Sequence, residues 1–305
     1  KFSGPPIFSM LLTVFTSTLN RAGLLPRIFE SIVRQKRTDI EWLVVDDGSE
    51  DDTPEIIAEF ARKVPFPIRY YRQPRGGKHR AYNMALLLAR GELMLTLDSD
   101  DWLPDKAVDM IEEYMPIVRC DKKICGMIAL KADANGNIYG REMSGKVLAA
   151  GDNAKYEEVM CTGERCIILK TDVARQYPFP TVEGELFMTE SVMFSRLSID
   201  YGFAIVNKVL SYCEYQSDGL TQNIHTLLCQ NPVGFMLYHS QRINQATTLK
   251  AAIGAALRYV AFRSMAGVNG NAAEHSGKYE WLIRLLSPLG PIGKLYYFIR
   301  NRQHI

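Results

Sequence analysis

Residues 93–101 read Leu-Met-Leu-Thr-Leu-Asp-Ser-Asp-Asp, an apolar run of strand length that ends in a cluster of carboxylates. Short apolar runs bounded by polar residues are typical of buried β-strands. The same arrangement occurs earlier, where Trp42–Val45 runs into Asp46-Asp47-Gly48-Ser49. Because ligands of open parallel sheets bind beyond the carboxyl ends of the strands, these polar strand exits predict a binding site at one edge of a sheet.

Helical patterns fill the spaces between the strands. From residue 24 to residue 33, apolar residues recur every three or four positions, which indicates one buried helix face. Up to residue 114 the predicted order is strand 7–15, helix 24–33, strand 42–45, helix 54–61, strand 68–71, helix 80–89, strand 93–97 and helix 105–114. This alternation predicts an α/β fold with a mostly parallel, Rossmann-like sheet and helices on both faces. Thr53-Pro54 predicts a helix start with a capping hydroxyl, and Gly91 predicts the end of the third helix.

The alternation weakens after residue 124. Asn135-Gly136-Asn137 indicates a turn, and a strand, a helix and a strand follow over residues 165–169, 189–201 and 203–212. From about residue 227 onward only helical segments are predicted. We therefore expect an α/β domain over residues 1–225 and a C-terminal helical extension over residues 226–305.

The C-terminal end, residues 279–302, is rich in apolar, aromatic and basic residues. Such an amphipathic end is typical of a helix that lies on a membrane surface. Packing of the same residues on the protein core would produce a similar pattern, so both interpretations stay open.

The composition excludes several classes of protein. Of 305 residues, 47% are hydrophobic, as in an ordinary globular protein, and the formal net charge of +2 gives no support for a nucleic-acid partner. Six cysteines without a CxxC pair predict reduced thiols. No stretch has the ~20 apolar residues of a membrane span or the regions of a signal peptide. We expect a cytoplasmic protein, with peripheral contact to the inner face of the membrane as the further option.

Three strand exits carry the candidate site. The first is Thr16-Ser17-Thr18-Leu19-Asn20-Arg21, the second begins at Asp46 and Asp47, and the third is Asp98-Ser99-Asp100-Asp101. Three carboxylates within four residues repel one another unless a cation or solvent relieves them. Mg²⁺ or Mn²⁺ suits such oxygen ligands and retains positions for phosphate oxygens. The alternative is a solvated acidic turn at the start of the next helix.

Two further segments fit a nucleotide ligand. A carboxylate at the second exit, Asp46 or Asp47, can accept a hydrogen bond from a uracil N–H or a ribose hydroxyl, although the same residues are typical of a tight turn. Residues 75–80, Arg-Gly-Gly-Lys-His-Arg, open a predicted helix and fit a diphosphate, with Lys78 and Arg80 as its cations. The segment matches neither a phosphate loop of kinases nor a dinucleotide-binding turn of dehydrogenases, which speaks against both classes.

Taken in order, these motifs resemble glycosyltransferase family 2, the inverting enzymes of GT-A fold. The resemblance covers residues 7–115 strongly and extends less specifically to about residue 222. It rests on Asn20-Arg21, Val44 to Ser49 with Asp52-Thr53, Asn83, Gly91-Glu92 and Leu97 to Trp102.

The resemblance implies roles for particular residues. Asp46 and Asp47 would lie at the nucleoside of the donor, and Asp98 and Asp100 would form the metal-binding DxD motif, with Asp100 as the more direct ligand and Asp101 in support. Asp218-Gly219-Leu220-Thr221 resembles a later loop near the donor phosphates. The implied donor-binding residues are Thr16, Asn20, Asp46, Asp47, Lys78, Arg80, Asp98 and Thr221.

The family also has an acidic general base at the start of a helix, and residues 183–191 resemble that segment. Glu190 is the candidate, because inverting transfer needs a carboxylate that takes the proton of the acceptor hydroxyl. Glu183 and Glu185 are the reserve candidates. An ordinary acidic residue favoured by the helix dipole is the alternative interpretation of Glu190.

The resemblance therefore implies a metal-dependent transferase that moves a sugar from a nucleoside-diphosphate sugar, with UDP-sugar favoured, to a hydroxyl of a glycan or lipid-linked acceptor in bacterial surface polysaccharide synthesis. A nucleotidyltransferase of related architecture would require a glycine-rich basic loop after the first strand, and residues 16–21 contain no glycine. A non-catalytic protein that binds nucleotide sugar or membrane would lack the metal acids or the base.

Overall fold

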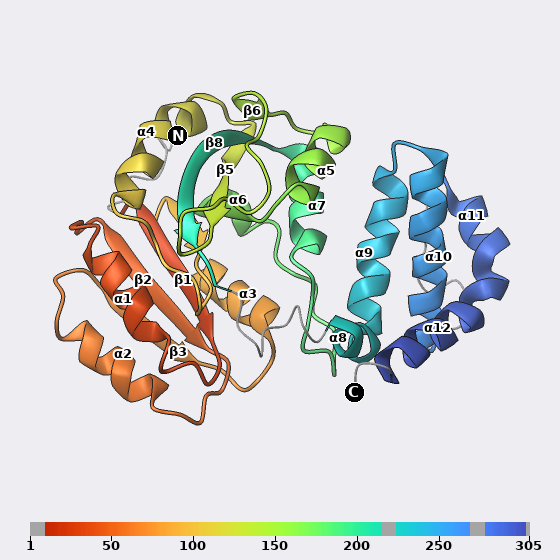
Figure 1. The fold of residues 1–305 in the computed structure, drawn as a ribbon, viewed down its shortest axis with the longest axis horizontal. Coiled ribbons are helices and arrows are strands. Elements are labelled where there is room, and N and C mark those ends of the chain that lie inside the picture. Colours follow the sequence, from red (N-terminus) through yellow and green to blue (C-terminus); the bar gives the residue numbers. More distant parts are fainter. Residues whose placement is uncertain (1–9, 215–223, 269–277, 303–305) are drawn as a thin grey trace, which may run out of the picture. The chain divides into compact units, whose positions relative to one another are not determined.

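The computed structural model of the protein describes residues 10–214, 224–268 and 278–302 (Figure 1). These residues form two compact units, one of residues 10–178 with 198–214 and one of residues 179–197 with 224–268 and 278–302. The predicted domain boundary at residue 225 stays a prediction. The units differ from it in one segment, because residues 179–197 group with the C-terminal helices.

The first unit is built on an eight-stranded sheet in the order β3-β2-β1-β4-β7-β5-β8-β6. β1, β2, β3 and β4 pair in parallel, as do β5 and β8, whereas β7 and β6 run antiparallel to their neighbours. The strands are β1 Leu12–Thr18, β2 Ile40–Asp46, β3 Ile68–Arg72, β4 Leu93–Thr96, β5 Ile124–Ala132, β6 Val147–Leu148, β7 Arg165–Lys170 and β8 Gly202–Tyr212. The mostly parallel α/β sheet predicted from the sequence is confirmed.

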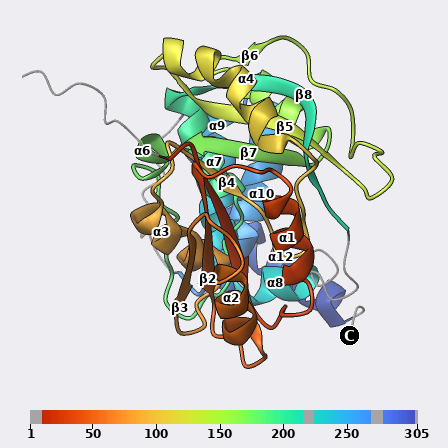
Figure 2. The same cartoon turned by 90° about the vertical axis from the view of Figure 1, so that its left-hand side faces the viewer.

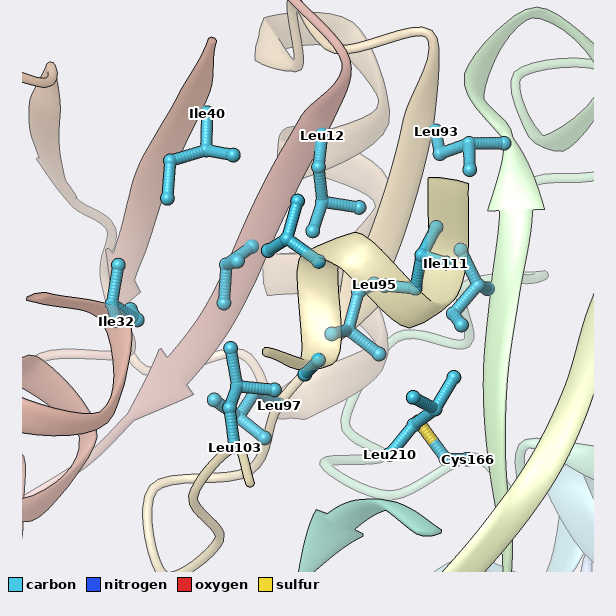
Figure 3. Close-up of a cluster of buried hydrophobic side chains, with 14 of the residues drawn as sticks. Leu12, Ile32, Ile40, Leu93, Leu95, Leu97, Leu103, Ile111, Cys166 and Leu210 are labelled. Carbon is cyan, nitrogen blue, oxygen red and sulfur yellow. The ribbon is translucent and has the colours of Figure 1, made fainter. Parts of the chain in front are cut away.

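Helices cover both faces of this sheet. Leu12 of β1 points into a buried apolar cluster that also holds Ile32 and Ile111 (Figure 3). Phe15 faces the other side, where its ring meets Tyr82 edge-on at 5.8 Å. Figure 2 shows α3 to the left of β2 and α1 to its right. The helices are α1 Leu25–Val33, α2 Thr53–Ala61, α3 Lys78–Leu88, α4 Ala107–Cys120, α5 Asn153–Cys161 and α6 Thr171–Ala174.

Two local predictions were wrong. α2 begins at Thr53 itself, with Asp52 as the capping residue, and the Thr53 hydroxyl donates to Oδ1 of Asp51 at 2.6 Å. α3 ends at Leu88, before Gly91. The glycine is needed because a Cβ there would lie 2.3 Å from the backbone nitrogen of Thr13, so Gly91 permits the close approach to β1.

The second unit is helical apart from its first residues, as predicted for the C-terminal end. α10 packs against α9, α11 and α12 around an apolar core in which Phe235 and Phe262 stack at 5.4 Å. Its helices are α8 Ile224–Gln230, α9 Pro232–Gln245, α10 Leu249–Met265, α11 Glu280–Leu286, the 3₁₀ turn η1 Ser287–Leu289 and α12 Gly290–Arg302. The helix α7, Ser191–Asp200, contributes residues to both units. Over the described ranges of the chain, no helix combines the length and apolar character needed to cross a bilayer.

Candidate functional site

Asn20 forms hydrogen bonds that connect the segments directly following β1 and β2. Its backbone N–H donates to Oγ of Ser49 at 2.9 Å, and its side-chain oxygen accepts from the backbone N–H of Glu50 at 2.8 Å. Asn20 has φ +52°, a left-handed conformation that asparagine tolerates better than most residues. The first two of the three predicted strand exits therefore lie in contact.

Asp46 is fully buried and shapes the turn that follows β2. Its Oδ1 accepts from the backbone N–H groups of Gly48 and Ser49 at 3.1 and 2.7 Å, and from the Ser49 hydroxyl at 2.6 Å. The Tyr70 hydroxyl donates to Oδ2 at 2.5 Å. Burial, together with this carboxylate, raises the pKa of Tyr70. Both carboxylate oxygens of Asp46 thus accept hydrogen bonds from within the protein. This is what the interpretation of the motif as a tight turn predicts.

Asp47 holds the glycine segment that opens α3. Its oxygens accept from the backbone N–H groups of Gly76 and Gly77, both at 2.8 Å, and from Nε2 of Gln73 at 2.7 Å. The sequence predicted that backbone N–H groups of this segment would bind a diphosphate. That expectation needs correction for Gly76 and Gly77, because the Asp47 carboxylate already accepts their hydrogen bonds. Arg80 also supports the segment, since its Nη1 donates to the carbonyl oxygen of Gly76 at 2.7 Å.

We expect Asp47→Ala to lower the free energy of unfolding by about 3 kcal/mol. The substitution leaves the N–H groups of Gly76 and Gly77 without their acceptor in a site where Asp47 is only 5% exposed. Urea unfolding followed by circular dichroism measures the change. Asp52→Ala is the matched control, because Asp52 is exposed and its side chain makes no capping bond, so it should cost less than about 0.5 kcal/mol. Equal losses in both variants would contradict the anchoring role.

Two lysines form ion pairs with the acidic cluster after β4 and reduce the repulsion among its carboxylates. Nζ of Lys78 lies 2.6 Å from Oδ1 of Asp98, and Nζ of Lys131 lies 2.7 Å from Oδ2 of Asp101. Burial would raise the pKa of Asp98, but the charges of Lys78 and Lys131 hold it below its usual value. Burial and the charge of Asp98 raise the pKa of Asp100. The contact through Lys78 joins the start of α3 to the exit of β4.

Pairing with Lys78 and Lys131 therefore relieves part of the repulsion among the three carboxylates. Among the residues that the structure describes, no group of three or more His, Cys, Asp or Glu side chains could enclose an ion. Asp98 and Asp100 are both partly exposed oxygen donors on the same loop. Mg²⁺ and Mn²⁺ usually need only one or two protein carboxylates when substrate phosphates complete the coordination, so these two residues fit such an ion.

Arg27 of α1 positions the acidic loop, and no pattern in the sequence predicts this role. Its Nη2 donates to the carbonyl oxygen of Asp100 at 2.6 Å, and its guanidinium lies 4.0 Å from the centre of the Trp102 ring. Its Nη1 pairs with Glu214 at 2.5 Å. The charge of Arg21 opposes the rise in the pKa of Asp100. Arg27 thus joins α1 to the loop after β4.

One predicted donor-binding residue, Thr16, does not join this cluster. Thr16 is fully buried, and its hydroxyl accepts from Nε1 of Trp42 at 3.0 Å, so its side chain supports the sheet. Thr221 lies outside the described residues, so its predicted role stays a prediction.

Glu190 stands at the start of α7, as predicted. Its carbonyl oxygen accepts from the backbone N–H groups of Met193 and Phe194 at 3.0 and 3.1 Å, and its side chain is exposed. Glu185, a reserve candidate for the base, instead stabilises the start of α9. Its carboxylate is buried and accepts from the backbone N–H groups of Val233 and Gly234 at 2.6 and 2.8 Å, where α9 begins.

Comparison with known proteins matches residues 13–175 to the sequence model of glycosyl transferase family 2. An uncharacterised glycosyltransferase of Nostoc is 34% identical over 106 residues, which are 34% of this chain and 33% of that protein. Chondroitin synthase of Escherichia coli is 36% identical over 105 residues, which are 34% of this chain and 15% of the synthase. The matched region thus spans a third or less of the length of these two relatives.

The fold is similar to those of solved glycosyltransferases of GT-A type. Staphylococcus aureus TarS, residues 1–349, superposes with a TM-score of 0.55 at 16% identity, over 93% of this chain and 92% of that one. The mannosyltransferase PcManGT of Pyrobaculum calidifontis, solved in complex with GDP-Man and Mn²⁺, gives a TM-score of 0.53 at 18% identity, over 99% and 86% of the two chains. At these identities the likeness establishes the fold alone.

Proposed function

The chain belongs to glycosyl transferase family 2, and from this premise we propose that it is an inverting, metal-dependent enzyme that moves a sugar from a nucleoside-diphosphate sugar to a hydroxyl acceptor. One observation carries the proposal. A continuous set of contacts joins the exits of β1, β2 and β4, from Asn20 through the Asp47-anchored glycine segment to the pair of Lys78 with Asp98. Such a junction of strand exits is where open α/β sheets bind nucleotides.

The donor would lie along this junction. Asn20 and the turn held by Asp46 would border the nucleoside, and Asp46 and Asp47 would act by fixing the backbone around it. Lys78 and Arg80 would meet the diphosphate. The side chain of Lys78 is partly exposed, so its ammonium group could exchange Asp98 for a phosphate oxygen when the donor binds.

Asp98 and Asp100 would hold Mg²⁺ or Mn²⁺. Such an ion supplies positive charge that stabilises the departing diphosphate. Asp101 would support the loop, because it is buried and paired with Lys131 of β5. Arg27 holds the same loop through the Asp100 carbonyl, which leaves the Asp100 carboxylate available for the ion.

Glu190 would act as the general base. Its carboxylate takes the proton of the acceptor hydroxyl while that oxygen forms a bond to the anomeric carbon. The bond from the anomeric carbon to the phosphate oxygen breaks on the opposite side, and the nucleoside diphosphate leaves with the electron pair. Inversion at the anomeric carbon follows from this geometry.

The substrates can be proposed only by class. A UDP-sugar donor and an acceptor that is a glycan or lipid-linked sugar are supported by the relatives named chondroitin synthase and hyaluronan synthase, and by a TarS structure in complex with UDP-GlcNAc. Bacterial surface polysaccharide synthesis is the setting that these similarities favour. A cytoplasmic location with peripheral contact to the inner face of the membrane fits a lipid-linked acceptor.

The proposal is tested by incubating the full chain with Mn²⁺ and a panel of nucleoside-diphosphate sugars. We expect slow hydrolysis of one donor, measured as release of nucleoside diphosphate. A parallel reaction with nucleoside triphosphates and sugar 1-phosphates addresses the alternative, because release of pyrophosphate there would identify a nucleotidyltransferase. Donor binding in calorimetry without release of diphosphate, even after acceptor sugars are added, would favour a non-catalytic binding protein.

A further inference from the structure

The end of the second unit exposes a large amount of apolar surface. On α11, η1 and α12, large apolar side chains are between 40% and 65% exposed. These side chains, here called the apolar surface, are Trp281, Leu285, Leu289, Ile292, Leu295, Tyr296, Phe298 and Ile299. Scattered exposed apolar residues are ordinary, whereas a contiguous group marks a site of interaction.

α12 is apolar on its inner and its outer side. On the inner side a Cβ at Gly293 would lie 2.6 Å from Cβ of Ala261, and the Tyr297 ring lies 4.8 Å from that of Phe262. On the outer side exposed residues recur with the spacing of a single helix face. This outer stripe consists of Ile292, Leu295, Tyr296 and Ile299. Packing within the unit therefore accounts for the inner side only.

Basic residues flank the apolar surface. Nζ of Lys294 lies 5.8 Å from the centre of the Phe298 ring, and the Arg300 guanidinium lies 5.6 Å from that of Tyr296. Between residues 278 and 302 the acidic side chain is Glu280, which pairs with Arg284 at 2.5 Å. The basic residues of the same segment whose side chains the structure describes are Lys278, Arg284, Lys294 and Arg300. The surface is thus apolar at its centre and positively charged around it.

We propose that the apolar surface docks on a lipid bilayer that contains anionic lipids. Apolar side chains would enter the boundary between headgroups and acyl chains, and the basic residues would meet the lipid phosphates. Trp281 and Tyr296 suit this boundary, because each has an apolar ring and a polar group.

A second copy of the chain fits this surface less well. In a symmetric dimer the same patch meets itself, so the basic residues of one copy would face those of the other with Glu280 as the acidic residue between them. An anionic bilayer supplies the opposite charge. Docking would also bring the second unit to the surface where a lipid-linked acceptor lies, and only this last point rests on the proposed function.

The test compares the full chain with an Ile292→Ser, Leu295→Ser double variant in flotation with lipid vesicles. We expect binding to vesicles of phosphatidylcholine and phosphatidylglycerol, weaker binding to phosphatidylcholine alone, and loss of binding as salt is raised. The double variant should bind at least ~10-fold more weakly, because it removes apolar groups that would be buried in lipid. The double variant Arg284→Glu, Arg300→Glu should bind more weakly to the anionic vesicles and should bind unchanged to vesicles of pure phosphatidylcholine.

Leu87→Ser is the matched control, because Leu87 is 81% exposed on α3 and lies outside the apolar surface. It should bind vesicles as the unchanged chain does. Equal vesicle binding by the Ile292→Ser, Leu295→Ser double variant and the unchanged chain would overturn the proposal. It would also be overturned if light scattering showed that the unchanged chain is a dimer and this double variant is a monomer. Donor hydrolysis is measured without vesicles. If the unchanged chain hydrolyses the donor but does not bind vesicles, docking is refuted and the proposed function still stands.

Discussion

Asp100→Ala should abolish the Mn²⁺-dependent binding of the donor and lower sugar transfer by at least ~1000-fold. The expectation follows from the loss of a carboxylate that would hold the ion, since the charge of such an ion is worth several kcal/mol to the departing diphosphate. Calorimetry with nucleoside diphosphate and Mn²⁺ measures binding, and release of nucleoside diphosphate measures transfer. Treatment of the unchanged enzyme with a chelator should reproduce the loss, and added Mn²⁺ should reverse it.

The structure indicates that this variant will fold. The loop is held by the backbone carbonyl of Asp100, which accepts from Arg27, and the substitution leaves that carbonyl in place. Asp105→Ala is the matched control, because Asp105 is an exposed acid four residues from Asp101 that pairs with Arg34 on the surface. It should retain metal-dependent binding. Unchanged donor affinity in Asp100→Ala would refute the assigned metal site.

Glu190→Gln should leave the affinity for the donor nearly unchanged and lower transfer at least ~100-fold. The amide keeps the size of the side chain but cannot take the proton of the acceptor hydroxyl. Because the side chain of Glu190 is exposed and the amide has the same size, we expect the variant to fold. Calorimetry measures donor affinity, and product formation with an acceptor measures transfer.

Glu183→Gln is the comparison for this effect, because Glu183 is an exposed acid of the same segment. It should transfer sugar normally. If Glu190→Gln retains transfer and Glu183→Gln loses it, the base is Glu183. Glu185 serves poorly as a test of catalysis, because removing its carboxylate leaves the backbone N–H groups of Val233 and Gly234 without acceptors and destabilises the start of α9.

The class of fold could be predicted from local patterns in the amino-acid sequence, and the same patterns predict where a site would lie. An apolar run that ends in acidic residues is a local pattern, and its repetition before Asp46 and Asp98 is enough to predict parallel strands with polar exits at one edge. Burial of strands and solvation of their exits depend on the residues themselves. For this reason the order of strands and helices up to residue 114 agrees with the structure, apart from a few residues at the ends of elements.

Which of these polar residues remain available to a ligand depends on long-range contacts that form when the chain folds. Asp46, Asp47 and Asp98 look alike in the sequence. In the fold, Asp47 accepts from Gly77, thirty residues away, whereas Asp98 keeps a partly exposed carboxylate beside Lys78. Arg27 reaches the acidic loop from 73 residues away. The physical reason is that a carboxylate takes whichever donors the packed chain brings within about 3 Å, and those donors come from distant segments that no local pattern reveals.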